Sequence, residues 1–91
     1  MKQTALKDIA AAIQRHLTRW EKDPVINAPD SHKMRPYFWA RAYASGNRVF
    51  VKTISYQASD SLTRQQALDY LAWIDAGNVG ARWQMREERM R

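Results

Sequence analysis

The stretch Pro36–Gln57, PYFWARAYASGNRVFVKTISYQ, carries two runs of aromatic and β-branched residues separated by a short polar segment. Aromatic and β-branched side chains favour β-strands. Between the two runs, Gly46 and Asn47 tolerate the positive φ angles that the tight turn of a β-hairpin requires. The sequence therefore predicts a β-hairpin over about 36–57.

The register of this hairpin follows by counting away from Gly46 and Asn47. The cross-strand pairs on one face are large, aromatic and basic: Tyr37 with Tyr56, Trp39 with Ile54, Arg41 with Lys52, and Tyr43 with Phe50. The pairs on the other face are mostly small: Phe38 with Ser55, Ala40 with Thr53, Ala42 with Val51, and Ala44 with Val49. The two faces of the hairpin therefore differ sharply in chemistry.

The N-terminal part of the chain shows the periodicity of an amphipathic helix over about 4–21. Its apolar residues recur at steps of three and four positions: Leu6, Ile9, Ala10, Ile13, Leu17 and Trp20. Pro24 and Pro29 follow within a polar segment and disfavour helical structure. We therefore expect a helix followed by a loop over 22–35.

A second helix is predicted over about 63–76, after a connection at 58–61. Thr63 and Gln66 have the spacing of a capping box, and Gly77 with Asn78 is typical of a helix stop. The residues expected on the buried stripe are Ala67, Leu68, Leu71, Ala72 and Ile74. The tail over about 81–90 has helical propensity and mixed charge, which indicates a third short helix or a frayed end.

These elements indicate the α+β class and the order helix, β-hairpin, helix (αββα), with a short basic C-terminal helix. A chain of 91 residues has room for one hydrophobic core and hence for a single domain. Helices packed on one face of a hairpin would leave its other face open. Two strands also leave two unprotected edges, so a homodimer that lengthens the sheet is one expectation.

Composition points to a basic protein of a reducing compartment. Lysine and arginine number 15 against 9 acidic residues, a net charge of +6, and cysteine is absent. Between Ser31 and Arg64 there are six basic residues and one acid, Asp60. No apolar run has the length of a signal peptide or a membrane span. We therefore expect a cytoplasmic protein with a polyanionic or acidic partner and no membrane association.

The aromatic and basic face of the hairpin is the leading candidate for a binding surface. Rings interleaved with cations suit single-stranded RNA or DNA, because bases stack on rings while cations bind phosphates. Arg41 opposite Lys52 is an unfavourable like-charge pair unless an anion or an acidic side chain lies between them. The candidate binding residues on the hairpin are Tyr37, Trp39, Arg41, Tyr43, Arg48, Phe50, Lys52 and Tyr56.

Two other interpretations of this face stay open at the level of sequence. Large aromatic residues at a period of two are commonly buried, so the rings could form the core, with Arg41 and Lys52 extending outward at its edges. Tryptophan, tyrosine and arginine are also the usual anchors of protein interfaces. In the tail, Arg82 and Arg86 could follow phosphates, whereas the presence of Glu87 and Glu88 favours a solvated helix face.

No catalytic or metal-binding motif accompanies these features. His16 and His32 have no second ligand at metal-binding spacing, and the chain contains neither a nucleophile elbow nor a glycine-rich phosphate loop. We therefore expect no enzyme activity, no metal and no cofactor. A small hydrolase or nuclease is the least favoured hypothesis, because no assembled set of catalytic groups is visible.

The compact, cysteine-free αββα pattern, with its short aromatic hairpin and the dense helical stretch LTRQQALDYLAWIDAGNVG (62–80), resembles accessory proteins of phages and mobile elements, among them anti-CRISPR inhibitors of host defence. The resemblance covers the whole chain in size and style and rests on no diagnostic motif. It implies inhibition of a host nucleoprotein complex by occupancy. Anti-CRISPR proteins that mimic DNA are mostly acidic, and this basic chain departs from that pattern. Guide RNA or an acidic protein surface is then the implied target.

The leading functional hypothesis is a non-enzymatic binding protein that acts on nucleic acid or on a nucleoprotein complex. One alternative is a protein-only interaction module whose positive charge meets an acidic surface. Another is a homodimeric DNA-binding regulator of a mobile element. The hairpin separates the two main helices, so a helix-turn-helix arrangement is not favoured.

Overall fold

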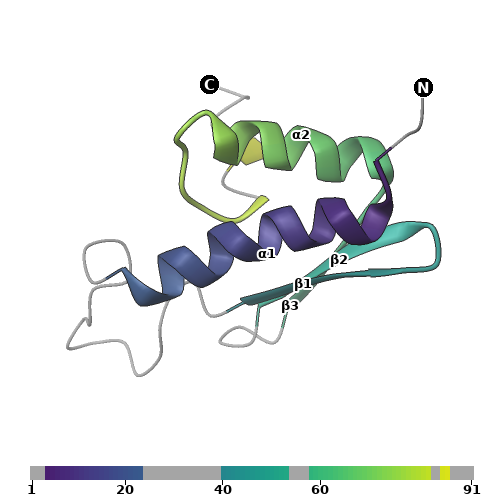
Figure 1. The fold of residues 1–91 in the computed structure, drawn as a ribbon, viewed down its shortest axis with the longest axis horizontal. Coiled ribbons are helices and arrows are strands. Elements are labelled where there is room, and N and C mark those ends of the chain that lie inside the picture. The colour runs from purple at the N-terminus through teal and green to yellow at the C-terminus, as the bar shows by residue number, and fades with distance from the viewer. Residues whose placement is uncertain (1–3, 24–39, 54–57, 83–84, 87–91) are drawn as a thin grey trace.

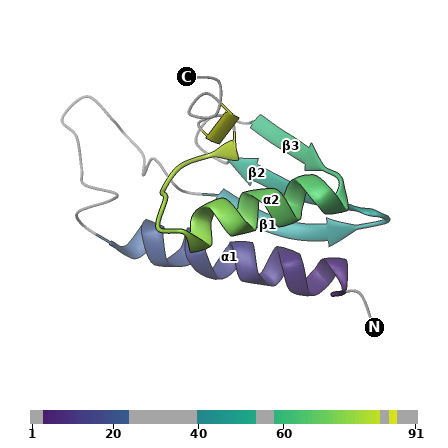
Figure 2. The ribbon, with the colours of Figure 1, turned by 90° about the horizontal axis from the view of Figure 1, so that it is seen from above.

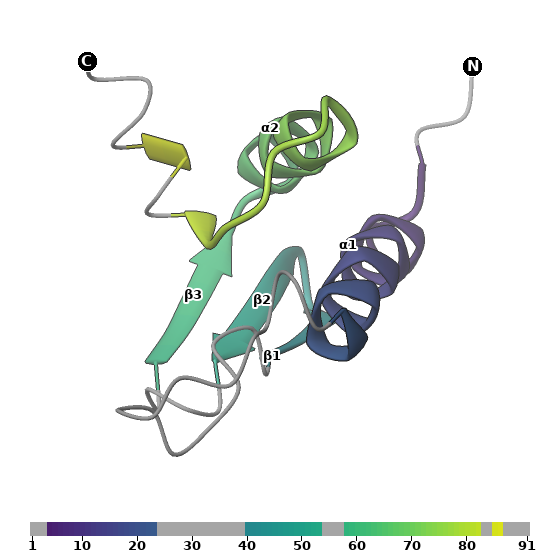
Figure 3. The same cartoon turned by 90° about the vertical axis from the view of Figure 1, so that its left-hand side faces the viewer.

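The computed structural model describes residues 4–23, 40–53, 58–82 and 85–86. Its elements follow in the order α1 (Leu6–Lys22), β1 (Ala40–Ser45), β2 (Arg48–Thr53), β3 (Ala58–Leu62) and α2 (Arg64–Asp75). The strands form one antiparallel sheet in the order β1-β2-β3. Both helices lie side by side on the same side of this sheet (Figures 1 and 3). The predicted α+β class is confirmed.

The register predicted for the hairpin is confirmed wherever its residues are described. Tyr43 lies opposite Phe50, and Arg41 lies opposite Lys52. The φ angle of Gly46 is +59°, which a residue with a side chain adopts only at a cost. The expected pairs that involve 36–39 and 54–57 lie outside the described residues.

The segment 58–61, which we expected to be a connection, belongs instead to a third strand. In β3, Leu62 lies opposite Val49 and Ser59 lies opposite Lys52. Serine and aspartate have low β-propensity, so the sequence ASDSL gives little local indication of a strand. Pairing with β2 and burial of Leu62, which is 0% exposed, stabilise it nonetheless. The order of elements is therefore αβββα.

Helix α1 begins and ends close to the predicted positions. Its buried residues belong to the predicted apolar stripe and are Ile9, Ala10, Ile13, Leu17 and Trp20. Lys22, which we assigned to the loop, is the last helical residue, and Asp23 follows as the C-cap. The rest of the expected loop lies outside the described residues.

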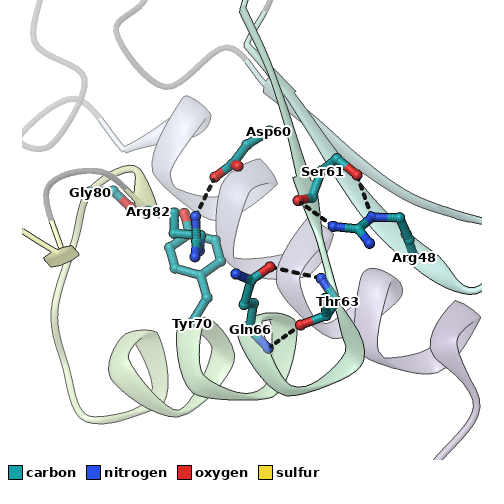
Figure 4. A network of polar contacts seen from close by, with 8 residues as sticks. All are labelled: Arg48, Asp60, Ser61, Thr63, Gln66, Tyr70, Gly80 and Arg82. Carbon is teal, nitrogen blue, oxygen red and sulfur yellow. Dashed lines mark hydrogen bonds and ion pairs between the residues drawn. The ribbon is translucent and has the colours of Figure 1, made fainter.

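Helix α2 starts with the predicted capping box (Figure 4). The Thr63 hydroxyl accepts a hydrogen bond of 3.2 Å from the Gln66 backbone, and the Gln66 side chain accepts one of 2.9 Å from the Thr63 backbone. The helix ends at Asp75, and Gly77 follows with a φ angle of +102°. The stop signal in the sequence is therefore confirmed.

The buried face of α2 differs in part from the expected stripe. Ala72 is exposed, and Leu68 and Leu71 are only partly buried. The buried positions are Ala67, Tyr70, Trp73 and Ile74. At 3.6 residues per turn Ala72 points almost directly away from Ala67 and Ile74, so α2 packs through its Tyr70 side.

The two helices run in the same direction and are linked at both ends of α2. At the start, the Arg64 guanidinium donates a hydrogen bond to the Thr4 carbonyl. At the far end, the His16 ring and the Asp75 carboxylate are 2.8 Å apart. Figure 2 shows the helices above the sheet, with α1 toward the β1 edge. This arrangement leaves the opposite face of the sheet uncovered by the helices.

The chain after α2 returns to the core. The Met85 backbone N–H donates to the Ala81 carbonyl at 3.2 Å, the bonding pattern of an α-helix, and Arg82, Met85 and Arg86 are helical. Met85 is only 3% exposed. The remaining residues of the expected tail helix, 83–84 and 87–90, lie outside the described residues. Among the described helices, none combines the length and apolar character needed to span a membrane.

Candidate functional site

The small face of the sheet is buried, and the aromatic face is left open. Val49, Val51 and Leu62 are at most 9% exposed and belong to the core beneath the helices. Successive side chains of a strand point to opposite faces, so the intervening residues point away from the helices. This second surface, the open face, consists of Arg41, Tyr43, Ser45, Arg48, Phe50, Lys52, Ser59 and Ser61.

No element of the described residues covers the open face, and Figure 3 shows α1 and α2 together on the other side of the sheet. The interpretation of the rings as core is therefore wrong for Tyr43, which is 46% exposed. The physical reason is that the small side chains of the opposite face pack closely against the two helices. The side chains of Ala42, Ala44, Val49 and Val51 let two helices approach the sheet closely, which large rings would prevent.

The centre of the open face is a stacked pair of rings. The ring centroids of Tyr43 and Phe50 lie 5.5 Å apart, and the ring planes differ by 16°. This offset stacking is a favoured geometry for aromatic pairs. Each ring has one face turned toward the other, and Phe50 is half-buried between Tyr43 and Ser61. The greater exposure of Tyr43 makes it the ring that a ligand would reach first.

The charged residues around the ring pair differ in their partners. Arg41 forms an ion pair with Glu21 of α1, with 3.1 Å between the nitrogen and oxygen atoms. This ion pair compensates the charge of Arg41. Lys52 is exposed, lies opposite Ser59, and forms no ion pair with another described residue. Positive charge on this row therefore resides mainly on Lys52.

Arg48 lies on the other side of the ring pair and is fixed in place (Figure 4). Its Nε donates to the Ser61 hydroxyl at 2.6 Å, and its Nη2 donates to the Ser61 carbonyl at 3.3 Å. The guanidinium is thus held across β2 and β3. Ser61, which the sequence reasoning did not single out, becomes relevant only because β3 exists.

The structure does not bring Arg82 to the open face. Only 14% of its side chain is exposed, and its Nη1 lies 3.5 Å from a carboxylate oxygen of Asp60. Asp60 lies opposite Val51, on the face covered by the helices. The expectation that Arg82 follows phosphates is therefore not supported, whereas Arg86 is exposed. The tail and the open face do not form one surface among the described residues.

The buried Tyr70 lies near Arg82 and the partly exposed Asp60 (Figure 4). Its hydroxyl donates a hydrogen bond of 2.8 Å to the Gly80 carbonyl. Burial, and to a smaller extent the negative charge of Asp60, raises the pKa of the Tyr70 hydroxyl. These contacts attach the segment after α2 to the rest of the domain. Sequence reasoning missed them because they join residues 10 and 22 positions apart without a local motif.

His16 has a structural environment. The Arg19 guanidinium donates to Nδ1 of His16 at 3.0 Å, and Nε2 lies 2.8 Å from the Asp75 carboxylate. A guanidinium can only donate, so Nδ1 accepts and Nε2 carries the proton. Within the described ranges, no group of three histidine, cysteine or acidic side chains could hold a metal ion. The candidates Tyr37, Trp39 and Tyr56, with His32, lie outside the described residues.

Comparisons of the chain with protein families, with characterised proteins and with solved structures found no match. The function is therefore inferred from the fold and from the open face.

Proposed function

We propose that this protein is a non-enzymatic domain that binds single-stranded nucleic acid on the open face of its sheet. The observation that carries the proposal is the stacked pair of the exposed Tyr43 and the half-buried Phe50, with the cations Arg48 and Lys52 on either side of Phe50 in β2. Nucleobases stack on aromatic rings, and lysine and arginine bind phosphates. The net charge of +6 favours a polyanionic partner over the whole molecule.

The arrangement favours a single strand over a duplex. Bases within a duplex are paired and stacked on one another, so their faces are not accessible to a ring on a sheet surface. Bases of a single strand can turn outward and stack on Tyr43, and the backbone can follow the cations along β2. The stacking is independent of base identity, so we expect little sequence preference.

The proposed biological setting comes from the resemblance to phage accessory proteins. In that setting the open face would occupy guide RNA within a host defence complex and block it without turnover. A chain without cysteine suits the reducing cytoplasm in which such complexes work.

The proposal is tested by fluorescence anisotropy with labelled single-stranded RNA, single-stranded DNA and duplex DNA over a series of salt concentrations. Tyr43→Ala removes the exposed ring, and Lys52→Glu reverses one charge on the open face. Arg15→Glu is the matched control, because Arg15 is exposed on α1, away from the open face, and changes the net charge equally. Circular dichroism of each variant checks that the fold is retained.

We expect both single-stranded probes to bind more tightly than the duplex, with affinity falling as salt rises. Tyr43→Ala should weaken binding by about 1–3 kcal/mol, because one base no longer stacks on the protein. Lys52→Glu should weaken binding far more than Arg15→Glu. If the wild-type protein binds none of the probes, or if the two charge reversals have equal effects, the proposal is wrong. A protein partner for the open face then becomes the leading hypothesis.

A further inference from the structure

The hydrogen bonds of Arg48 leave part of its guanidinium available to bind an anion. Its Nε and Nη2 atoms, which form one edge of the guanidinium, both donate to Ser61. A guanidinium carries five N–H donors, so three remain, on Nη1 and Nη2. These three have no partner among the described residues. One N–H of Nη1 and the remaining N–H of Nη2 lie on the same edge and can bind two oxygens of a phosphate at once.

The other arginines near the sheet are engaged differently. Arg41 is paired with the carboxylate of Glu21, and Arg82 lies largely buried beside Asp60. Carboxylates compete with phosphates for the same donors, so these two arginines are less suited to a ligand. Among the described residues of the sheet, Arg48 is the arginine that is held by a neutral residue, and its charge remains uncompensated by an acid.

Lys52 provides a second cation farther along β2. Arg48 and Lys52 lie four positions apart on β2, with Phe50 between them on the same face. At the rise of a β-strand their Cα atoms are about 13 Å apart. In duplex DNA each strand carries one phosphate per about 3.4 Å of helix axis, so a strand that passes both residues offers more than one phosphate. The Arg48 guanidinium is held at Ser61, opposite Phe50, and Lys52 adds a second cation along the same strand for another part of the backbone.

We infer that Arg48, held in position by Ser61, is the phosphate-binding fork of the open face, with Lys52 as a second phosphate contact and a base stacked on Tyr43. This inference rests on the proposed function and specifies the ligand as the phosphodiester backbone of a single-stranded oligonucleotide. Ser61 is a positioning residue. Its hydrogen bonds fix the guanidinium before binding, which reduces the conformational entropy lost in the complex.

The test uses a labelled oligothymidine and a labelled oligouridine with six proteins besides the wild type, one of them Tyr43→Ala. Ser61→Ala removes the hydroxyl that holds Arg48, and Ser61→Thr restores it. Arg48→Lys keeps the charge without the fork, whereas Arg48→Ala removes both. Arg15→Ala is the control for loss of one exposed positive charge. Affinity and the slope of its logarithm against the logarithm of salt concentration are measured for each protein, after circular dichroism has verified the fold.

We expect Ser61→Ala to lower affinity roughly two- to tenfold with an unchanged salt slope, because no charge is lost. Ser61→Thr should bind as the wild type does. Arg48→Lys should lower affinity about tenfold at an unchanged slope, and Arg48→Ala should also reduce the slope by about 0.7. Arg15→Ala should leave the slope unchanged.

Two results separate the possible failures. Ser61→Ala and Arg48→Lys could both bind as the wild type does while Tyr43→Ala weakens binding. In that case the assignment of Arg48 as the phosphate-binding fork is wrong and the proposed function stands. The same conclusion follows if Arg15→Ala reduces the salt slope as much as Arg48→Ala. If the wild-type protein binds neither oligonucleotide, the inference and the proposed function fall together.

Discussion

Replacing Tyr70 by phenylalanine tests how the segment after α2 is attached to the domain. The Tyr70 hydroxyl is buried and donates a 2.8 Å hydrogen bond to the carbonyl of Gly80, which is itself buried. Phenylalanine fills the same space but leaves that carbonyl without a donor among the described residues. An unsatisfied buried carbonyl costs about 1–3 kcal/mol, partly offset because the variant buries no hydroxyl, so we expect a loss of about 1–2 kcal/mol at pH 7.

The difference between the two proteins should shrink at alkaline pH. The pKa of Tyr70 is raised in the folded state, mainly by burial. Above the unfolded pKa of about 10, the unfolded chain releases this proton while the folded protein keeps it. The unfolded state then binds fewer protons, so the stability of the wild type falls with pH by about 1.4 kcal/mol per unit. Phenylalanine has no such loss, and the two stabilities should meet at about pH 11.

Urea denaturation followed by circular dichroism, at steps from pH 7 to pH 11, measures both effects. Lysines and the other tyrosines are present in both proteins, so their titration largely cancels in the difference between the unfolding free energies. Equal stabilities at pH 7 would refute the role assigned to the Gly80 hydrogen bond. A difference that stays constant up to pH 11 would refute the raised pKa of Tyr70.

Three further substitutions test other parts of the fold. Leu62→Ala should lower the free energy of unfolding by about 2–5 kcal/mol, because Leu62 is fully buried; Ser59→Ala, an exposed change on the same strand, should stay within about 0.5 kcal/mol in the same urea titration. Thr63→Ala removes the capping box and should lower the melting temperature in calorimetry by about 4–8 °C, the equivalent of about 1 kcal/mol; an unchanged melting temperature would show that the cap is not needed. Gln14→Ala removes the acceptor that lies 2.7 Å from the Ala42 backbone nitrogen, so hydrogen exchange at the Ala42 amide should accelerate, and unaltered exchange would contradict that contact.

Features encoded by neighbouring residues were predictable. The hairpin register depends on Gly46 and Asn47 alone, and the start of α2 depends on Thr63 and Gln66, three positions apart. Each of these signals acts through backbone groups within one turn of the chain. They therefore needed no knowledge of the rest of the fold.

Features that depend on distant partners were not predictable. The β3 strand has a local composition typical of a loop, and it exists because β2 offers an edge and the core accepts Leu62. The choice between an open and a buried ring face had no local signal either, because both faces alternate regularly. It depends on which face accommodates two helices closely. The pairing of Arg41 with Glu21 links residues 20 positions apart and changes which cation of the open face is available.

The burial of Met85 bears on how the protein is made. Its side chain belongs to the same core as α1, which is synthesised first. Loss of such a side chain from a core costs about 2–5 kcal/mol, a large share of the total stability of about 5–15 kcal/mol that is usual for a domain. The core is thus incomplete until residue 85 has left the ribosome. A nascent chain from which Met85 has not yet emerged should therefore expose the apolar surface that this side chain covers in the folded domain.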